Sequence, residues 1–117
     1  MKSVLIVDDD IDLLSIMASV MEKQQLNTYT ATGIHTALKL LEDKTVDIIC
    51  SDFNMRDGTG LKLLETLRQQ NVKTPFVLMS GNYDLILKQE AERLSASFFC
   101  KADHDLIAKI KSLAESK

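Results

Sequence analysis

The chain has 117 residues, the size of a single domain, and its 45% hydrophobic and 26% charged residues are ordinary for a globular protein. A net charge of −3 at pH 7 argues against direct binding to nucleic acid or to an anionic membrane, and no apolar run approaches the roughly 20 residues needed to cross a bilayer. The first apolar run meets Asp8 too early to be a signal peptide, so we expect a cytoplasmic protein.

Five short runs of apolar or β-prone residues predict strands. Most of them are apolar throughout and end at turn residues, which is typical of a strand buried on both faces. In chain order the predicted strands are Lys2–Val7, Leu26–Thr30, Val46–Ser51, Pro75–Met79 and Phe98–Cys100.

Apolar residues at helical spacing predict a helix after each strand. The expected helices are Asp10–Lys23, residues 34–41, a helix that follows Thr59, Leu85–Leu94, and a last helix that contains Leu106, Ile110 and Leu113. Thr59 and Asp103 are the expected N-caps of the third and last helices, and Asp10 or Asp12 favours the N-terminus of the first.

Alternation of strand and helix predicts an α/β domain with a parallel sheet and helices on both faces. Five strand–helix units fit the flavodoxin-like (βα)5 doubly wound fold, with strand order 2-1-3-4-5, and we expect residues 1–117 to form one domain. The first strand–helix turn lacks the G-x-G-x-x-G pattern, so the sequence gives no support for nicotinamide binding.

Cys50 and Cys100 are the only cysteines, and both lie inside apolar runs without a zinc-like spacing. In the predicted order a strand separates them, which places them about 9–10 Å apart. Cysteines whose Cα atoms lie beyond about 7 Å cannot be bridged without backbone movement, so we expect two free thiols.

Polar residues follow the carboxyl ends of the central strands, which meet at one edge of a parallel sheet. They are Asp8 and Asp9 after the first strand, Asp52 after the third, Ser80 after the fourth and Lys101 after the fifth. Three carboxylates at one edge repel one another unless a cation compensates, and such oxygen ligands suit Mg²⁺. The sequence therefore predicts a magnesium site at this edge.

Such a site suits a phosphoryl group carried on Asp52, because aspartate carboxylates serve as nucleophiles in phosphoryl transfer. Lys101 and Ser80 would hold the phosphoryl oxygens that the metal leaves free. No residue is left as an obvious base for an external substrate. We therefore expect a phosphoacceptor that catalyses only its own phosphorylation and dephosphorylation, and not an enzyme acting on other molecules.

Four motifs occur in order at these strand ends: VLIVDDD, SDFNM followed by Gly60 and Leu61, PFVLMSG, and FFCK. With them, nearly the whole chain resembles the receiver domains of two-component response regulators, and most of all the stand-alone chemotaxis type. The resemblance implies that Asp52 is the phosphoacceptor. It also implies that Asp8, Asp9, Asp52 and the backbone carbonyl of Asn54 hold Mg²⁺.

The same resemblance implies a switch and a set of partners. Ser80 would be the switch hydroxyl, Phe98 the aromatic residue whose rotamer follows it, and Lys101 the lysine that pairs with the phosphoryl group. The phosphoryl donor would be a sensor histidine kinase or a histidine phosphotransfer protein. A downstream protein would bind the face formed by the fourth helix, the fifth strand and the fifth helix, with no direct contact to nucleic acid or membrane.

Three positions depart from the family pattern. Arg56 and Ala102 stand where proline is usual, and a cis bond before Ala102 would cost about 2.5–4 kcal/mol. The segment Leu94–Ser97 lacks the glycine usual before the fifth strand.

Two alternatives remain open at the level of sequence. A Mg²⁺-dependent phosphatase of the haloacid dehalogenase type would use the D-x-D spacing of Asp8 and Asp10, but the chain is short for that fold and Asp52 would lack a role. A pseudo-receiver, a binding module that is not phosphorylated, is suggested by Arg56 and Ala102, whereas the intact acidic set argues against it.

Overall fold

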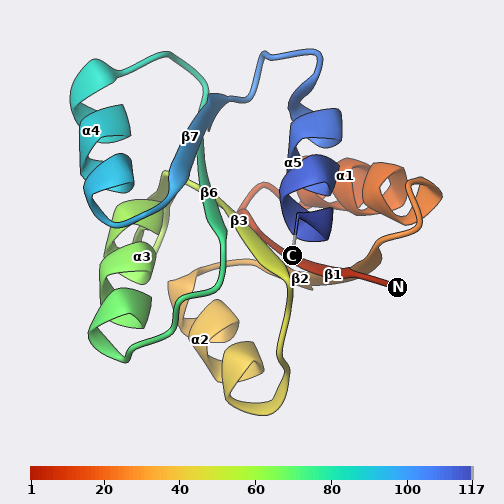
Figure 1. Cartoon of the computed structure of the whole chain (residues 1–117), viewed down its shortest axis with the longest axis horizontal. Helices are drawn as coiled ribbons and strands as arrows, with labels where there is room; N and C mark the ends of the chain where they lie inside the picture. Colours follow the sequence, from red (N-terminus) through yellow and green to blue (C-terminus); the bar gives the residue numbers. More distant parts are fainter. Residues whose placement is uncertain (117) are drawn as a thin grey trace.

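Five parallel strands form the central sheet of the computed structural model, which describes residues 1–116 (Figure 1). Residue 117, the last of the expected domain, lies outside the described residues. The strand order β2-β1-β3-β6-β7 confirms the predicted order 2-1-3-4-5. The strands are β1 (Ser3–Val7), β2 (Asn27–Ala31), β3 (Ile48–Asp52), β6 (Phe76–Ser80) and β7 (Ser97–Cys100).

Helices cover both faces of the sheet, with α1 and α5 on one face and α2, α3 and α4 on the other (Figure 1). Their bounds are α1 (Ile11–Lys23), α2 (Ile34–Asp43), α3 (Gly60–Gln69), α4 (Leu85–Arg93) and α5 (Leu106–Glu115). None of the helices within residues 1–116 has the length and hydrophobicity to cross a membrane.

Side chains of the central strands alternate between two apolar cores. Val4 and Ile6 of β1 pack under α1 and α5, whereas Leu5 and Val7 pack under the other three helices. Because both faces are buried, every position of such a strand favours an apolar residue. This is why the strands could be recognised as continuous apolar runs.

The two cysteines lie on β3 and β7 and are free thiols, as expected. Strand β6 lies between their strands in the sheet. Cys50 is buried in the core beside α1 and α5, and this burial raises the pKa of its thiol.

A small antiparallel hairpin between β3 and α3 was not predicted. It consists of β4 (Asn54–Met55) and β5 (Gly58–Thr59), and Arg56 and Asp57 form the turn between them. Gly58 has a φ of 141°, a conformation that L-residues with side chains rarely adopt. Glycine at this position therefore lets the chain leave the turn and start α3.

Helix caps agree with the sequence at two of three positions. The Asp10 carboxylate accepts a hydrogen bond from the Leu13 N–H (3.1 Å), and the Thr59 hydroxyl accepts one from the Lys62 N–H (3.1 Å). The prediction that Asp103 caps the last helix was wrong. The backbone carbonyl of Asp103 closes the turn before α5, and its carboxylate lies 3.4 Å from the Lys109 ammonium.

The Arg68 guanidinium, at the end of α3, joins three segments near the amino edge of the sheet. It donates hydrogen bonds to the carbonyls of Val72 (2.8 Å) and Thr74 (3.0 Å), which precede β6. It also donates to the carbonyls of Leu94 (2.8 Å) and Ser95 (3.3 Å), at the end of α4. One side chain thus satisfies carbonyls that the two helix ends and the loop leave unpaired.

Helices α1, α3 and α4 end in the same motif, in which a non-glycine residue adopts a left-handed conformation. These residues are Gln25, Asn71 and Ser95, with φ values of 65°, 62° and 60°. After α4, the Ala96 N–H bonds to the Ala91 carbonyl and the Ser95 N–H to the Glu92 carbonyl, the pairing of a Schellman motif. Ser95 thus occupies the place where the sequence lacked the expected glycine.

Replacing Ser95 with glycine is expected to raise the free energy of unfolding by about 0.5–1 kcal/mol. An L-residue with a side chain in the left-handed conformation costs roughly 1–2 kcal/mol, and glycine removes this cost. The greater conformational freedom of glycine in the unfolded chain offsets part of the gain in stability. Urea denaturation measures the difference. Ser97→Gly in β7 is the matched control and should destabilise, so a loss of stability in Ser95→Gly as well would contradict the prediction.

Candidate functional site

Three carboxylates meet at the carboxyl edge of the sheet. One oxygen atom from each of Asp8, Asp9 and Asp52 lies within 4.8 Å of the others. Strands β1 and β3 are neighbours, with Val7 opposite Ser51, so the residues that follow them are brought side by side. The Asp8 side chain is only 1% exposed, whereas Asp9 and Asp52 are half-buried and open to solvent on one side.

Lys101 completes this cluster from the edge strand β7. Its ammonium lies 2.8 Å from Asp8 Oδ2 and 3.1 Å from Asp52 Oδ1. The Lys101 N–H donates to the Ser80 carbonyl (2.8 Å), which fixes the start of the side chain beside β6. No cis peptide bond occurs within residues 1–116, so the bond from Lys101 to Ala102 is trans.

The ionisation of the cluster reflects burial and mutual contact. Burial raises the pKa of Asp52, and Lys101 only partly opposes this effect. Burial lowers the pKa of Lys101, but the hydrogen bonds and charges of Asp8 and Asp52 together outweigh it and raise that pKa. One ammonium thus pairs with two of the three carboxylates, and the surplus negative charge makes the edge a good place for a cation.

The donor set fits Mg²⁺. It consists of carboxylate oxygens close together in a partly hydrated position, and Mg²⁺ binds one or two carboxylates while keeping several waters. Asn54, whose carbonyl the family resemblance adds to this set, lies in β4, two residues after Asp52.

Ser80 and Phe98 lie beside the cluster rather than in it. Ser80 ends β6, the strand next to Asp52, and its hydroxyl accepts a hydrogen bond from the Asn82 N–H (3.4 Å). Phe98 is buried in β7, and its ring meets the edge of the Tyr83 ring at a centroid distance of 6.2 Å. The structure thus brings Asp8, Asp9, Asp52 and Lys101 together, with Ser80 on the adjoining strand end and Phe98 in the core.

Asp10, the second aspartate of the D-x-D spacing, is engaged elsewhere. It is exposed and its carboxylate caps α1, while its own N–H donates to Asp8 Oδ1 (2.9 Å). This gives Asp10 a structural role outside the carboxylate cluster.

Two contacts of the hairpin turn were missed by sequence reasoning. The Arg56 N–H donates to Asp9 Oδ2 (2.9 Å). The Asp57 carboxylate accepts hydrogen bonds from the N–H groups of Ile34 and His35 (3.0 Å each), at the first turn of α2. Both contacts join residues far apart in sequence. The only sequence feature that pointed to the Asp57 contact was Gly33, a glycine at the N-cap position of α2, where a residue with a capping side chain is usual.

Replacing Asp57 with asparagine is expected to lower the free energy of unfolding by about 0.5–1 kcal/mol at pH 7, because the amide keeps one acceptor oxygen but loses the second acceptor and the negative charge at the N-terminus of α2. The hydrogen bonds from His35 and Ile34 lower the pKa of Asp57, so its contribution is present above the ordinary carboxyl pKa of about 3.9 and is lost as the pH falls through the folded value.

Urea denaturation at pH 7 and near pH 3 tests this, and the difference between Asp57→Asn and wild type should shrink in acid. Asp105→Asn is the control, because Asp105 precedes α5 without a side-chain capping bond. An equal loss in both variants would contradict a specific role for Asp57.

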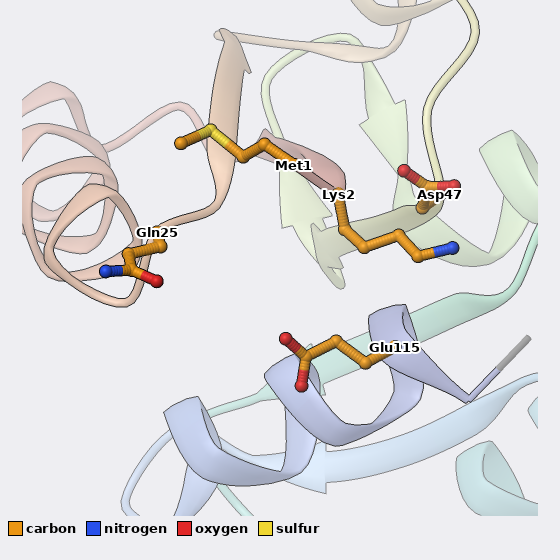
Figure 2. Close-up of a pocket in the computed structure, with 5 residues that line it drawn as sticks. All are labelled: Met1, Lys2, Gln25, Asp47 and Glu115. Carbon is orange, nitrogen blue, oxygen red and sulfur yellow. The ribbon is translucent and has the colours of Figure 1, made fainter.

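A cavity of about 790 Å³ lies away from the cluster, near the amino ends of the strands. Met1, Lys2, Gln25, Asp47 and Glu115 line it (Figure 2). Ser3, which begins β1, donates to Asp47 through its N–H (2.8 Å). The cavity is therefore at the opposite edge of the sheet from Asp52, and its size alone does not make it the site of the chemistry.

Comparisons with known proteins agree with this geometry. The sequence matches the response regulator receiver domain family over residues 4–110. Regulatory protein AtoC of Escherichia coli strain K12 is 29% identical over 103 residues, which cover 88% of this chain and 22% of AtoC. The chain thus spans less than a quarter of the length of that relative.

Solved structures share the fold. The receiver domain of the Francisella response regulator 1452 superposes with a TM-score of 0.91 at 26% identity, covering 99% of this chain and 98% of that one. The chemotaxis response regulator CheY4 of Vibrio cholerae gives a TM-score of 0.87 at 24% identity, covering 97% and 98%. With the fold, the strand-end cluster and the match over residues 4–110 in agreement, the chain belongs to the response regulator receiver domain family.

Proposed function

We propose that this receiver domain accepts a phosphoryl group on Asp52 from a phosphohistidine donor, with Mg²⁺ as cofactor. The observation that carries the proposal is the convergence of Asp8, Asp9 and Asp52 within 4.8 Å, with the Lys101 ammonium 3.1 Å from Asp52. Three carboxylates at such close range repel one another, and a single ammonium does not neutralise them, so the cluster favours binding of a further cation.

In the proposed reaction, a carboxylate oxygen of Asp52 attacks the phosphorus atom of phosphohistidine. An O–P bond forms, the P–N bond breaks, and the imidazole leaves with the electron pair. Asp8, Asp9, Asp52 and the Asn54 carbonyl would hold Mg²⁺, which neutralises charge on the phosphoryl oxygens. Lys101, whose ammonium lies 3.1 Å from Asp52 Oδ1, would bind a further phosphoryl oxygen, and the Ser80 hydroxyl would donate to another.

No further reaction is proposed for this site. The domain would catalyse only its own phosphorylation and dephosphorylation, as a cytoplasmic signalling protein. A phosphatase using Asp8 and Asp10 is disfavoured because the Asp10 carboxylate is committed to the first turn of α1. The acidic cluster likewise favours a phosphorylated domain over a pseudo-receiver, since three carboxylates so close together are costly to keep without a cation.

The proposed donor is a sensor histidine kinase or a histidine phosphotransfer protein, and the output is a change in binding of a downstream protein. The face formed by α4, β7 and α5 suits binding of the downstream protein. It carries a hollow of about 390 Å³ lined in part by Tyr83 and Phe98, and the adjacent Leu85 and Ile86 are exposed. Phosphorylation would draw the Ser80 hydroxyl toward Asp52 and change the packing of Phe98.

Beryllofluoride, a mimic of a phosphoryl group on aspartate, tests the proposal. Titration with beryllofluoride and Mg²⁺, followed by amide NMR, is expected to shift the signals of Asp52, Ser80 and Phe98 together. Omitting Mg²⁺ is the control and should leave the spectrum unchanged. If the Asp52 signal does not shift when beryllofluoride and Mg²⁺ are both present, the acceptor role is contradicted. If the Asp52 signal shifts but the Phe98 signal does not, the proposed switch role of Phe98 is contradicted.

A further inference from the structure

The hydrogen bond between Arg56 and Asp9 connects the hairpin turn to the carboxylate cluster. The Arg56 N–H lies 2.9 Å from Asp9 Oδ2, although the two residues are 47 positions apart. The donor belongs to the backbone, so this hydrogen bond requires a residue with a backbone N–H at position 56 and does not require the guanidinium.

The position of this N–H is fixed by contacts that do not involve Asp9. The turn is closed by the pairing of β4 with β5, in which Met55 lies opposite Gly58. Asp57, the second residue of the turn, accepts hydrogen bonds from two N–H groups of α2 at 3.0 Å each. The Arg56 amide is therefore held by the hairpin and by α2 while it contacts the carboxylate.

Asp8, the buried carboxylate of the cluster, is oriented in a similar way. Asp8 accepts from the Asp10 N–H at Oδ1 (2.9 Å) and from the Lys101 ammonium at Oδ2 (2.8 Å). Asp9 is half-buried, and within residues 1–116 the Arg56 amide is the one hydrogen-bond donor to its side chain. A bond at Oδ2 leaves Oδ1 free to face a cation.

We propose that Arg56 is a positioning residue for the divalent cation, because its backbone amide orients the Asp9 carboxylate before the metal binds. The inference rests on the proposed Mg²⁺-dependent function and adds a residue to it. Holding a side chain in its binding conformation removes the ordering penalty from the binding step. Loss of the amide should therefore weaken Mg²⁺ binding by about threefold to tenfold.

Two substitutions at this position separate the backbone donor from the side-chain charge. Arg56→Pro removes the N–H, whereas Arg56→Ala keeps it, and both remove the guanidinium. Proline is well tolerated as the first residue of a turn that follows an extended residue, which is the place of Arg56 after Met55. Titration with Mg²⁺ alone, followed by calorimetry or amide NMR, gives the dissociation constant of each variant.

The Kd of Arg56→Pro is expected to exceed that of Arg56→Ala by about threefold to tenfold. Equal constants in the two variants, with Mg²⁺ still bound by the wild type, would overturn the inference and leave the proposed function standing. A wild-type protein that binds no Mg²⁺ would overturn both.

Hydrogen exchange of the Arg56 amide provides a second measurement that does not need the proline variant to fold. In the wild type without Mg²⁺ this amide should exchange slowly for an exposed turn residue, and Asp9→Ala should speed its exchange at least about tenfold, since the acceptor is lost. Unchanged exchange would overturn the inference. The amides of Ile34 and His35, which bind Asp57, serve as the internal reference and should keep their rates.

Discussion

Asp52→Asn should abolish the mass increase of one phosphoryl group that the wild type is expected to show after incubation with a phosphohistidine donor and Mg²⁺. The carboxylate is the proposed nucleophile, and an amide oxygen in the same place neither attacks phosphorus nor forms a stable acyl phosphate. Intact-protein mass spectrometry measures the change. Asp43→Asn, at the exposed end of α2, is the control and should be phosphorylated like the wild type.

A mass increase that persists in Asp52→Asn would place the acceptor elsewhere.

The same variant has a second expected effect, on stability. Burial raises the pKa of Asp52, so the protonated form is favoured in the folded state. The stability that this group contributes is present below the unfolded pKa of about 3.9, and it is lost as the pH rises through the folded value.

Without Mg²⁺ at pH 7, Asp52→Asn is therefore expected to be more stable than the wild type, and urea denaturation measures the difference. Adding Mg²⁺ should stabilise the wild type, because the ion binds the folded state. It should stabilise the variant less, since one carboxylate is missing. A variant less stable than the wild type at pH 7 would contradict the inferred penalty of burying the ionised Asp52 carboxylate.

Lys101→Ala is expected to slow phosphorylation by about 10²–10³-fold, the usual effect of removing one donor that stabilises developing charge. The ammonium lies 3.1 Å from Asp52 Oδ1, in position for a phosphoryl oxygen on that residue. Mg²⁺ binding should be unchanged or tighter, because removing the ammonium leaves the three carboxylates with no internal cation.

Two measurements in opposite directions make this prediction specific. Rates of phosphorylation at saturating Mg²⁺ report the first effect, and calorimetric titration with Mg²⁺ reports the second. Lys109→Ala is the control, since Lys109 lies on α5 and pairs with Asp103 and Asp105. Weaker Mg²⁺ binding in Lys101→Ala would show that Lys101 supports the metal site rather than the phosphoryl group.

The sheet and its order could be predicted because strands buried on both faces give continuous apolar runs. Asp8 follows β1 and Asp52 ends β3, and these strands are neighbours, so the proximity of the two carboxylates could be predicted from topology. Lys101 follows a strand that does not pair with β3, and its long side chain reaches Asp52 beside the end of β6. These positions depend on strand order, for which five strand–helix units favoured 2-1-3-4-5 among the common doubly wound orders.

The hairpin and its contacts could not be predicted in the same way. Strands β4 and β5 are two residues long each, too short for any periodic pattern. The Arg56 amide carries no side-chain signal, and the cap that Asp57 provides to α2 depends on tertiary approach across 23 positions. Asp103 is not the cap because α5 begins at Leu106 with Asp105 in the N-cap position, and the Asp103 carboxylate lies 3.4 Å from the Lys109 ammonium.

The bonds of the Arg68 guanidinium have a consequence for how a signal can move through the domain. They tie the ends of α3 and α4 to the loop before β6, at the edge of the sheet remote from Asp52. If the proposed phosphorylation of Asp52 rearranges that edge, we expect the first turn of α4 to move more than its last turn, which the Arg68 bonds hold in place. The exposed Leu85 and Ile86 lie in that first turn, where the largest displacement would meet a partner.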